Sequence, residues 1–394
     1  RLEGMWSFVA IKDDLSHWIA SRDIFSEKPL FYHKDNEGGI YYASTPLQIK
    51  ILLNSDSKDY INEDYIKRYL YLGHRGMYAT NDCLLQKTRR VEGNSVIKED
   101  GQNFNLSKII DIPRHETKES KSHEEYKDMI SNVLKDSYNK DKSVKASCML
   151  SGGIDSNLIY HKWNENKEEV IDSYTLKIKD KKYDESEIVK SSVKKIKEAI
   201  HKFVEIDKDL SYKWLRSIIS ENLDFLPSIT SIAFAHVANK AKDDDHKVIL
   251  TGVGGDEMFA GYLVHHLYFL AELERTKSNK YNEEYEIWDK EVNSYIRNKE
   301  LKDPKAFAIK YNQGFWIDNN EEMNLFRNSK EVNKYNIEAL NQNNSNDKNF
   351  LWKSLMNDLF ISSIPAQTSS ADYVSMFFSL ENRAPLLSYK ILDI

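Results

Sequence analysis

The sequence has few cysteines, no long apolar run and no excess of positive charge. Its 394 residues include two cysteines, Cys83 and Cys148, which form neither a CxxC pair nor a metal-ligand cluster, so a disulfide framework or a zinc site is not expected. We find no run of about 18 apolar residues and no signal peptide, which argues against a membrane span. The formal net charge of −6 is opposite in sign to that of most nucleic-acid-binding domains. These absences predict a cytoplasmic protein without membrane or nucleic-acid partners.

The first part of the chain is predicted to be rich in β-strands. Runs of aromatic and β-branched residues predict strands at 5–12 and 39–44. A helix is predicted at 63–72, and turn signals predict a hairpin at 91–104. Residues 22–39 resemble a turn-rich connection. Residues 113–125 are polar and charged, as in a linker. We therefore predict one domain over residues 1–112 and a linker over residues 113–125.

The second part alternates strands with helices. Strands are expected at 144–150, 170–178, 201–206 and 247–252, with helices at 125–138, from Asn157 onward, and at 185–200. The last of these helices would bury Ile188, Val189, Val193, Ile196 and Ile200 on one face. This alternation predicts a doubly wound parallel sheet, which binds ligands at the carboxyl ends of its strands. Residues 263–371 are rich in aromatic residues and nearly free of glycine, which favours a helical region packed on the sheet.

A glycine loop, SGGIDS at residues 151–156, follows the first of these strands. Backbone N–H groups of such a loop can approach phosphate oxygens closely, and the following helix adds favourable partial charge. Asp155 cannot bind a phosphate directly, but it can hold a divalent metal that bridges to one. No lysine follows the glycines, so the Walker pattern is absent and the loop suits the pyrophosphate of ATP. For this loop alone, a simple strand–turn–helix with a serine cap is an equally good interpretation.

A second glycine loop, TGVGGDE at residues 251–257, follows the strand at 247–252 and brings Asp256 and Glu257. Two glycine loops at neighbouring strand ends, each with an aspartate, could hold Mg²⁺ between them. The pair therefore favours a nucleotide site over two unrelated turns.

Together these motifs resemble the asparagine synthetase family. SGGIDS is similar to the pyrophosphate loop of ATP pyrophosphatases. TGVGGDEMFAGY resembles the family element GDGGDE-FGGY, SLENRAPLL at 379–387 resembles S-LE-R-PFLD, and YDESE at 183–187 resembles DE-S. GMWSFVAIKDD, ASRDIFSEKPLFY and YYASTPLQI, near the start of the chain, resemble the end of the family's glutamine-hydrolysing domain. The motifs follow the family order along essentially the whole chain.

This resemblance implies a fold and a reaction. The fold would be α/β, with part of an Ntn-type, β-rich class II glutamine amidotransferase domain over residues 1–112. An ATP pyrophosphatase (PP-loop, HUP-like) synthetase domain with a doubly wound parallel sheet and a helical insertion would follow over residues 126–394. ATP would adenylate a substrate carboxylate, pyrophosphate would leave, and ammonia from glutamine would form the amide, with Mg²⁺ as cofactor. The chain would thus be a glutamine-dependent carbon–nitrogen ligase, expected as a homodimer.

Site residues are assigned by matching motif positions. The resemblance assigns ATP binding to Leu150, Ser151, Gly152, Gly153, Asp155, Ser156, Leu176, Gly252 and Gly254. It assigns Mg²⁺ to Asp155 and Asp256, and a catalytic role to Glu381. An ion pair between Glu381 and Arg383 that merely positions the loop is an equal alternative for that pair. His265 and His266 are expected to be partly exposed helical residues rather than catalytic bases.

Three departures from the family pattern bear on the substrate. Val253 stands where most asparagine-forming members have an acid and lactam-forming members have an aromatic residue, and it can neither accept a proton nor contact an amine. Tyr373 replaces a basic residue, and one cationic contact to pyrophosphate is missing or supplied elsewhere. The element PFLD has become PLLS at 385–388. Aspartate is therefore not secured as the substrate, and three alternatives stay open: amidation of a sugar carboxylate, an intramolecular amide as in lactam synthetases, and a non-catalytic ATP-binding relative.

Both ends of the chain are expected to be cut. The family's glutaminase nucleophile is an N-terminal cysteine whose own amine acts as base, and Arg1 is not that residue. The family also carries a lysine beyond the E-R-P element, and the chain stops at Ile394 before it. We expect these 394 residues alone to make no amide from glutamine; release of glutamate from glutamine would contradict this.

Overall fold

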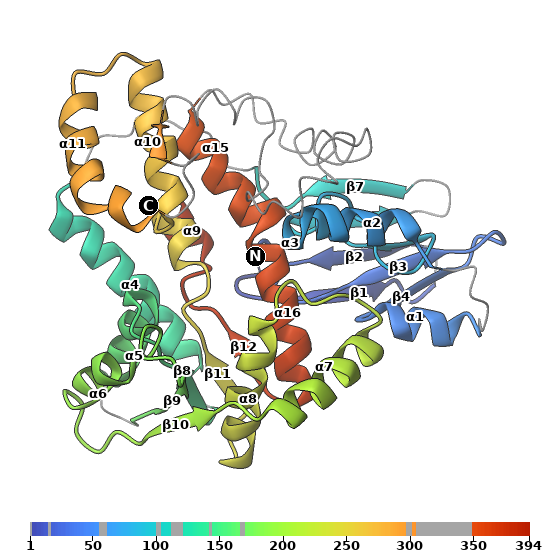
Figure 1. The fold of residues 1–394 in the computed structure, drawn as a ribbon. Helices are drawn as coiled ribbons and strands as arrows, with labels where there is room; N and C mark the ends of the chain where they lie inside the picture. The colour runs from blue at the N-terminus through green and yellow to red at the C-terminus, as the bar shows by residue number, and fades with distance from the viewer. Residues whose placement is uncertain are drawn as a thin grey trace.

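The structure is a computed structural model with a β-rich region, a parallel α/β region and a helical region (Figure 1). The residues it describes are 2–14, 17–54, 61–99, 104–111, 121–141, 144–165, 170–296, 302–304 and 349–394. The fold is therefore the expected α/β arrangement, with antiparallel sheets first and a parallel sheet later.

The β-rich region contains two antiparallel sheets. One has the order β1-β2-β6-β7 and the other the order β4-β3-β5. Their strands are β1 (Ser7–Ile11), β2 (Trp18–Arg22), β3 (Phe31–Lys34), β4 (Ile40–Ala43), β5 (Thr88–Arg90), β6 (Ser95–Glu99) and β7 (Phe104–Lys108). The helices are α1 (Pro46–Leu52), α2 (Glu63–Leu72) and α3 (His74–Met77). The expectation that residues 22–39 form only a connection was wrong, because β3 lies within them and pairs on both sides with β4 and β5.

The second region is built on a five-stranded parallel sheet of order β10-β9-β8-β11-β12. Its strands are β8 (Ala146–Met149), β9 (Asp172–Lys177), β10 (His201–Glu205), β11 (Val248–Leu250) and β12 (Glu381–Arg383). The chain moves outward from β8 to β9 and β10, then returns to place β11 on the other side of β8. The strand order therefore reverses between β8 and β11, where doubly wound sheets bind ligands.

Helices cover both faces of this sheet (Figure 1). They are α4 (His123–Asp141), α5 (Ile154–Glu165), α6 (Ser186–Val193) and α17 (Tyr389–Leu392) on one face, and α7 (Lys208–Asn222), α8 (Thr230–Asp243) and α16 (Ile364–Phe377) on the other. Strand residues alternate between the two cores: Val248 and Leu250 pack with α5, whereas Ile249 packs with α8 and α16.

Two expected helix boundaries differ from the structure. Helix α5 begins at Ile154, so Asp155 lies in its first turn rather than in the loop. Helix α6 ends at Val193, and the proposed single apolar face was wrong. Val189 is fully buried, whereas Ile188 and Ile200 are 58% and 52% exposed. The periodic pattern continued past the true end of the helix because turn residues also pack on the sheet.

The third region is helical where it is described. Its helices are α9 (Gly255–Phe259), α10 (Leu263–Arg275), α11 (Tyr281–Glu291), the 3-10 turn η2 (Asn293–Tyr295), α15 (Phe350–Asn357) and the π-helical turn η5 (Asp358–Ser362). Much of the expected helical region at 263–371 falls at 305–348, outside the described residues.

Buried polar contacts join the β-rich region to the parallel-sheet region. The guanidinium of Arg90 lies 2.9 Å from the Asp224 carboxylate, and both side chains are almost fully buried. Lys28 pairs with Asp372 of α16 at 2.8 Å, and the Thr368 hydroxyl donates to the Ser26 carbonyl. Removing one partner of a buried pair leaves an uncompensated charge, so these contacts hold the two regions in one orientation.

Candidate nucleotide site

The two glycine loops lie side by side at the carboxyl edge of the parallel sheet. Strand β8 leads into the first loop and β11 into the second, and the two strands pair directly in parallel register. The prediction that the two loops follow neighbouring strands is therefore confirmed. Two of the predicted ATP-binding residues also lie at this edge: Leu150 directly follows β8, and Leu176 is the second-last residue of β9.

The first loop presents backbone donors that the chain's own oxygens accept. The Ser151 N–H donates to the Ser156 hydroxyl at 3.1 Å, and the Gly153 N–H to the Ser151 hydroxyl at 3.1 Å. The Gly152 N–H donates to a carboxylate oxygen of Glu185 at 2.8 Å. Each of these three N–H groups thus donates to a side-chain oxygen, and an anion such as pyrophosphate would take the place of such oxygens.

The second loop packs directly against the first. A Cβ at Gly252 would lie 2.9 Å from the Ser156 nitrogen, and one at Gly255 would lie 2.2 Å from the Asp155 carboxyl carbon. Gly254 has φ of +96°, and its Cβ would lie 2.4 Å from a methyl group of Leu387. A side chain at Gly252 or Gly255 would push the two loops apart, and one at Gly254 would collide with Leu387 and strain a positive φ.

Three carboxylates gather where the loops meet. Burial, together with the nearby charges of Asp256 and Glu257, raises the pKa of Asp155 to about 6. Burial also raises the pKa of Asp256, against the opposing influence of His265. Like charges close together in a partly buried place disfavour ionisation, and a bound cation would relieve that cost.

The third of these carboxylates has a structural role. Glu257 is 1% exposed, and one of its oxygens accepts from Tyr262, Ser363 and Gln367 at 2.7, 2.7 and 2.8 Å. It ties the second loop to α16, so Asp155 and Asp256 are the carboxylates available to a ligand.

This donor set fits Mg²⁺ together with a polyphosphate. In the part of the chain that the structure describes, no group of three or more His, Cys, Asp or Glu side chains could hold a metal by itself. Mg²⁺ is commonly held by one or two carboxylates plus substrate phosphates and waters. Asp155 and Asp256 would provide those carboxylates, and the loop N–H groups would hold the phosphates.

The predicted catalytic residue Glu381 lies in β12, opposite Val248 of β11. Its carboxylate forms an ion pair with Arg383, with Nε and Oε1 separated by 2.6 Å. The ion pair between Glu381 and Arg383, which was the alternative interpretation of these residues, is thus observed. The catalytic role of Glu381 stays a prediction.

Two of the three departures from the family pattern, Val253 and Tyr373, lie in an apolar cluster and at the contact between regions, respectively. Val253 packs against a cluster that includes Phe25, Leu359 and Leu387. Tyr373 is 4% exposed, and its hydroxyl lies 3.3 Å from Asp224 at the junction of the two regions. Its phenol therefore takes part in the contact between regions.

Both cysteines and His265 are buried. Burial raises the pKa of the Cys83 and Cys148 thiols to about 12 in each case, so the reactive thiolate form is disfavoured at both positions. The expectation of partial exposure was wrong for His265, which is 1% exposed and lies 3.1 Å from Asp358. His266, its neighbour on α10, is exposed as expected.

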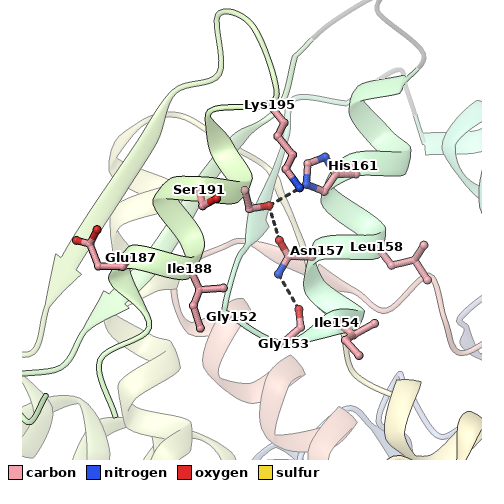
Figure 2. Close-up of a pocket in the computed structure, with 11 residues that line it drawn as sticks. Gly152, Gly153, Ile154, Asn157, Leu158, His161, Glu187, Ile188, Ser191 and Lys195 are labelled. Atoms are coloured by element: carbon pink, nitrogen blue, oxygen red, sulfur yellow. Dashed lines mark hydrogen bonds between the residues drawn. The ribbon is translucent and has the colours of Figure 1, made fainter. Parts of the chain in front are cut away.

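Sequence reasoning missed two residues beside the first loop. Glu185 was noted only within the YDESE motif, and Asn157 only as the start of a helix. An open pocket of about 810 Å³ lies between α5 and α6 and is lined by Gly152, Gly153, Asn157 and His161, among others (Figure 2). The position of Asn157, a polar residue directly after SGGIDS, could have indicated that it contacts the loop.

The chain is similar to known proteins over both of its main regions. The family model "Asparagine synthase" matches residues 129–394, and the model "Glutamine amidotransferase domain" matches residues 1–108. A curated relative from Methanocaldococcus jannaschii, named "Putative asparagine synthetase (glutamine-hydrolyzing) 2", is 26% identical over 276 residues, covering 67% of this chain and 51% of that protein. The chain spans about half the length of that relative. Across the described part of this chain, none of the helices is long and apolar enough to cross a membrane.

Proposed function

The chain belongs to the asparagine synthase family, and we propose that it uses ATP to activate a carboxylate for amide formation. The observation that carries this proposal is the junction of two glycine loops at the strand-order reversal, with Asp155 held between them. Such an edge is where doubly wound sheets bind ligands.

In the proposed reaction, an oxygen of the substrate carboxylate attacks the α-phosphorus of ATP and pyrophosphate leaves. An amine then attacks the acyl carbon, AMP leaves, and the nitrogen gives up a proton. The N–H groups of residues 151–153 would bind the pyrophosphate, and Leu150, Leu176, Gly252 and Gly254 would lie along the nucleotide. Mg²⁺, held by Asp155 and Asp256, would neutralise charge on the leaving group.

Glutamine is the proposed nitrogen source of the whole protein, in keeping with the amidotransferase match over residues 1–108. The thiolate is the reactive form of cysteine. Neither thiol of the chain is suited to hydrolyse glutamine, because burial raises the pKa of both well above neutral. We therefore expect the 394 residues to use free ammonia and to release no glutamate from glutamine.

A carboxylate other than aspartate is the second candidate substrate. Val253 carries no polar atom on its side chain and packs in an apolar cluster, so it offers no partner to a substrate amine. This observation favours a carboxylate without an amine to be bound at this position, such as a sugar carboxylate, over aspartate.

The proposal is tested by exchange of labelled pyrophosphate into ATP, with Mg²⁺ and a panel containing aspartate, uronic acids and amino-substituted carboxylates. Carboxylate-dependent exchange supports adenylation and identifies the acid. ATP binding without exchange on any acid would instead favour a non-catalytic ATP-binding relative. Absence of ATP binding would overturn both.

A further inference from the structure

A line of side chains connects helix α6 to the back of the first glycine loop (Figure 2). Asn157 is the residue directly after SGGIDS. Its amide nitrogen donates to the Ser151 carbonyl at 2.8 Å and to the Gly153 carbonyl at 2.7 Å. Its amide oxygen accepts from the Ser192 hydroxyl of α6, and the same hydroxyl lies 2.8 Å from Nε2 of His161.

Hydrogen-bond chemistry assigns a direction to every member of this line. If the Asn157 amide were turned over, its oxygen would face two carbonyl oxygens, so the nitrogen must point to the loop. Its oxygen can only accept, so Ser192 must donate its single proton to it. His161 Nε2 must therefore carry the proton that Ser192 accepts, and the line is satisfied in this one arrangement.

The peptide geometry of the loop carries the effect to the phosphate side. In a trans peptide, the carbonyl of one residue and the N–H of the next point in opposite directions. Holding the Ser151 carbonyl toward Asn157 turns the Gly152 N–H the other way, where it meets the Glu185 carboxylate. The Ser156 hydroxyl also reaches the same two carbonyls, at 3.4 and 3.3 Å, but it has one proton and longer contacts.

We infer that Asn157, held by Ser192 and His161, is a positioning residue that aims the loop amides at the pyrophosphate of ATP. This inference rests on the proposed function. It assigns α6 a part in nucleotide binding through the loop carbonyls, although neither Ser192 nor His161 needs to touch the ligand. The expected effect is specific to ligands that carry a pyrophosphate group.

Asn164 provides a matched control on the same helix. It is buried, whereas Asn157 is half-buried; its amide nitrogen donates to the Tyr160 carbonyl at 2.8 Å, and its oxygen accepts from the Ile171 N–H at 3.0 Å. An Asn164→Ala variant loses comparable side-chain-to-backbone bonds at the other end of α5. It therefore reports the general cost of losing such bonds without touching the loop.

The experiment measures binding of Mg·ATP, pyrophosphate and AMP by calorimetry, with thermal unfolding of each variant. Asn157→Ala should weaken the binding of Mg·ATP and of pyrophosphate by about tenfold, which is the effect expected from the loss of two ordinary hydrogen bonds. The affinity for AMP should not change. Ser192→Ala should lower the affinity for the same two ligands by a smaller factor. Ser192→Thr, which keeps the hydroxyl, should bind them more tightly than Ser192→Ala does. Asn164→Ala should lower the unfolding temperature but keep all three affinities.

Three results would overturn the inference. Wild-type Mg·ATP and pyrophosphate affinities retained in Asn157→Ala would remove the positioning role and leave the proposed function intact. An equal loss for all three ligands, or the same loss in Asn164→Ala, would show that only general destabilisation is at work. If the wild-type protein bound neither ATP nor pyrophosphate, the proposed function itself would fall, and the inference with it.

Discussion

The two glycine loops have similar sequences but opposite surroundings. In the first loop, a Cβ at Gly153 would meet only the Ser151 hydroxyl, at 3.2 Å. In the second, a Cβ at Gly252, Gly254 or Gly255 would approach neighbouring atoms to between 2.2 and 2.9 Å. The first loop is therefore open beside Gly153, whereas the glycines of the second loop let it pack closely against the first loop and Leu387. Glycine at a strand end can thus serve binding or packing, and only the neighbours distinguish the two.

The largest expected effect is a loss of ATP affinity when an aspartate of these loops is replaced, and its size should differ between Asp155 and Asp256. Asp155→Ala should weaken Mg²⁺-dependent ATP binding on the order of 100-fold, because a metal ion contributes several kcal/mol of charge stabilisation. Asp256→Ala should weaken Mg²⁺-dependent ATP binding by a smaller factor, since Asp155 would remain between the loops. Calorimetry with and without Mg²⁺ measures both. Asp207→Ala, which removes an aspartate cap from α7, is the control and should bind normally.

The same prediction has a pH dependence. The carboxylate of Asp155 is ionised above its pKa, which burial and neighbouring acids raise to about 6. Protons therefore compete with Mg²⁺ as the pH falls through this value, and Mg·ATP affinity should drop below about pH 6. Equal affinity in Asp155→Ala and wild type would contradict the assignment of this residue.

The next effect tests the contrast between the glycines. Gly255→Ala should lower the free energy of unfolding by roughly 1–3 kcal/mol, because the added methyl group overpacks the contact with Asp155. Gly153→Ala should keep most of the stability and instead weaken pyrophosphate binding, since its methyl group would stand in the binding loop. Thermal unfolding and calorimetry on both variants measure the two quantities. If Gly153→Ala were the less stable variant, the proposed difference between the loops would be wrong.

The smallest effect concerns the carboxylate that already accepts from the first loop. Glu185→Gln removes a negative charge next to the Gly152 N–H and keeps the size of the side chain. Pyrophosphate and ATP should bind up to about fivefold more tightly, the range expected for a partly exposed charge. Glu187→Gln, two residues along and paired with Lys190 at the surface, is the matched control. Weaker binding in Glu185→Gln would instead indicate that the carboxylate supports the loop.

The sequence predicted the parallel sheet and its two glycine loops because each strand and loop has a strong local signal. Shorter elements were missed for a physical reason. Strand β12 has three residues, Glu381–Arg383, and forms only because β11 offers an unpaired edge beside it. Strand β3 lies among turn-forming residues and is stabilised by partners on both sides.

The sequence by itself determined where phosphate-binding chemistry could occur, since glycine and aspartate at strand ends follow from local patterns. Tertiary structure decided which groups meet there. Asp155 and Gly255 are 100 positions apart in the chain, and Asn157 reaches Ser192 only because α5 and α6 pack on the same face of the sheet. These contacts depend on how layers pack, and packing depends on the whole core, which no short stretch of sequence encodes.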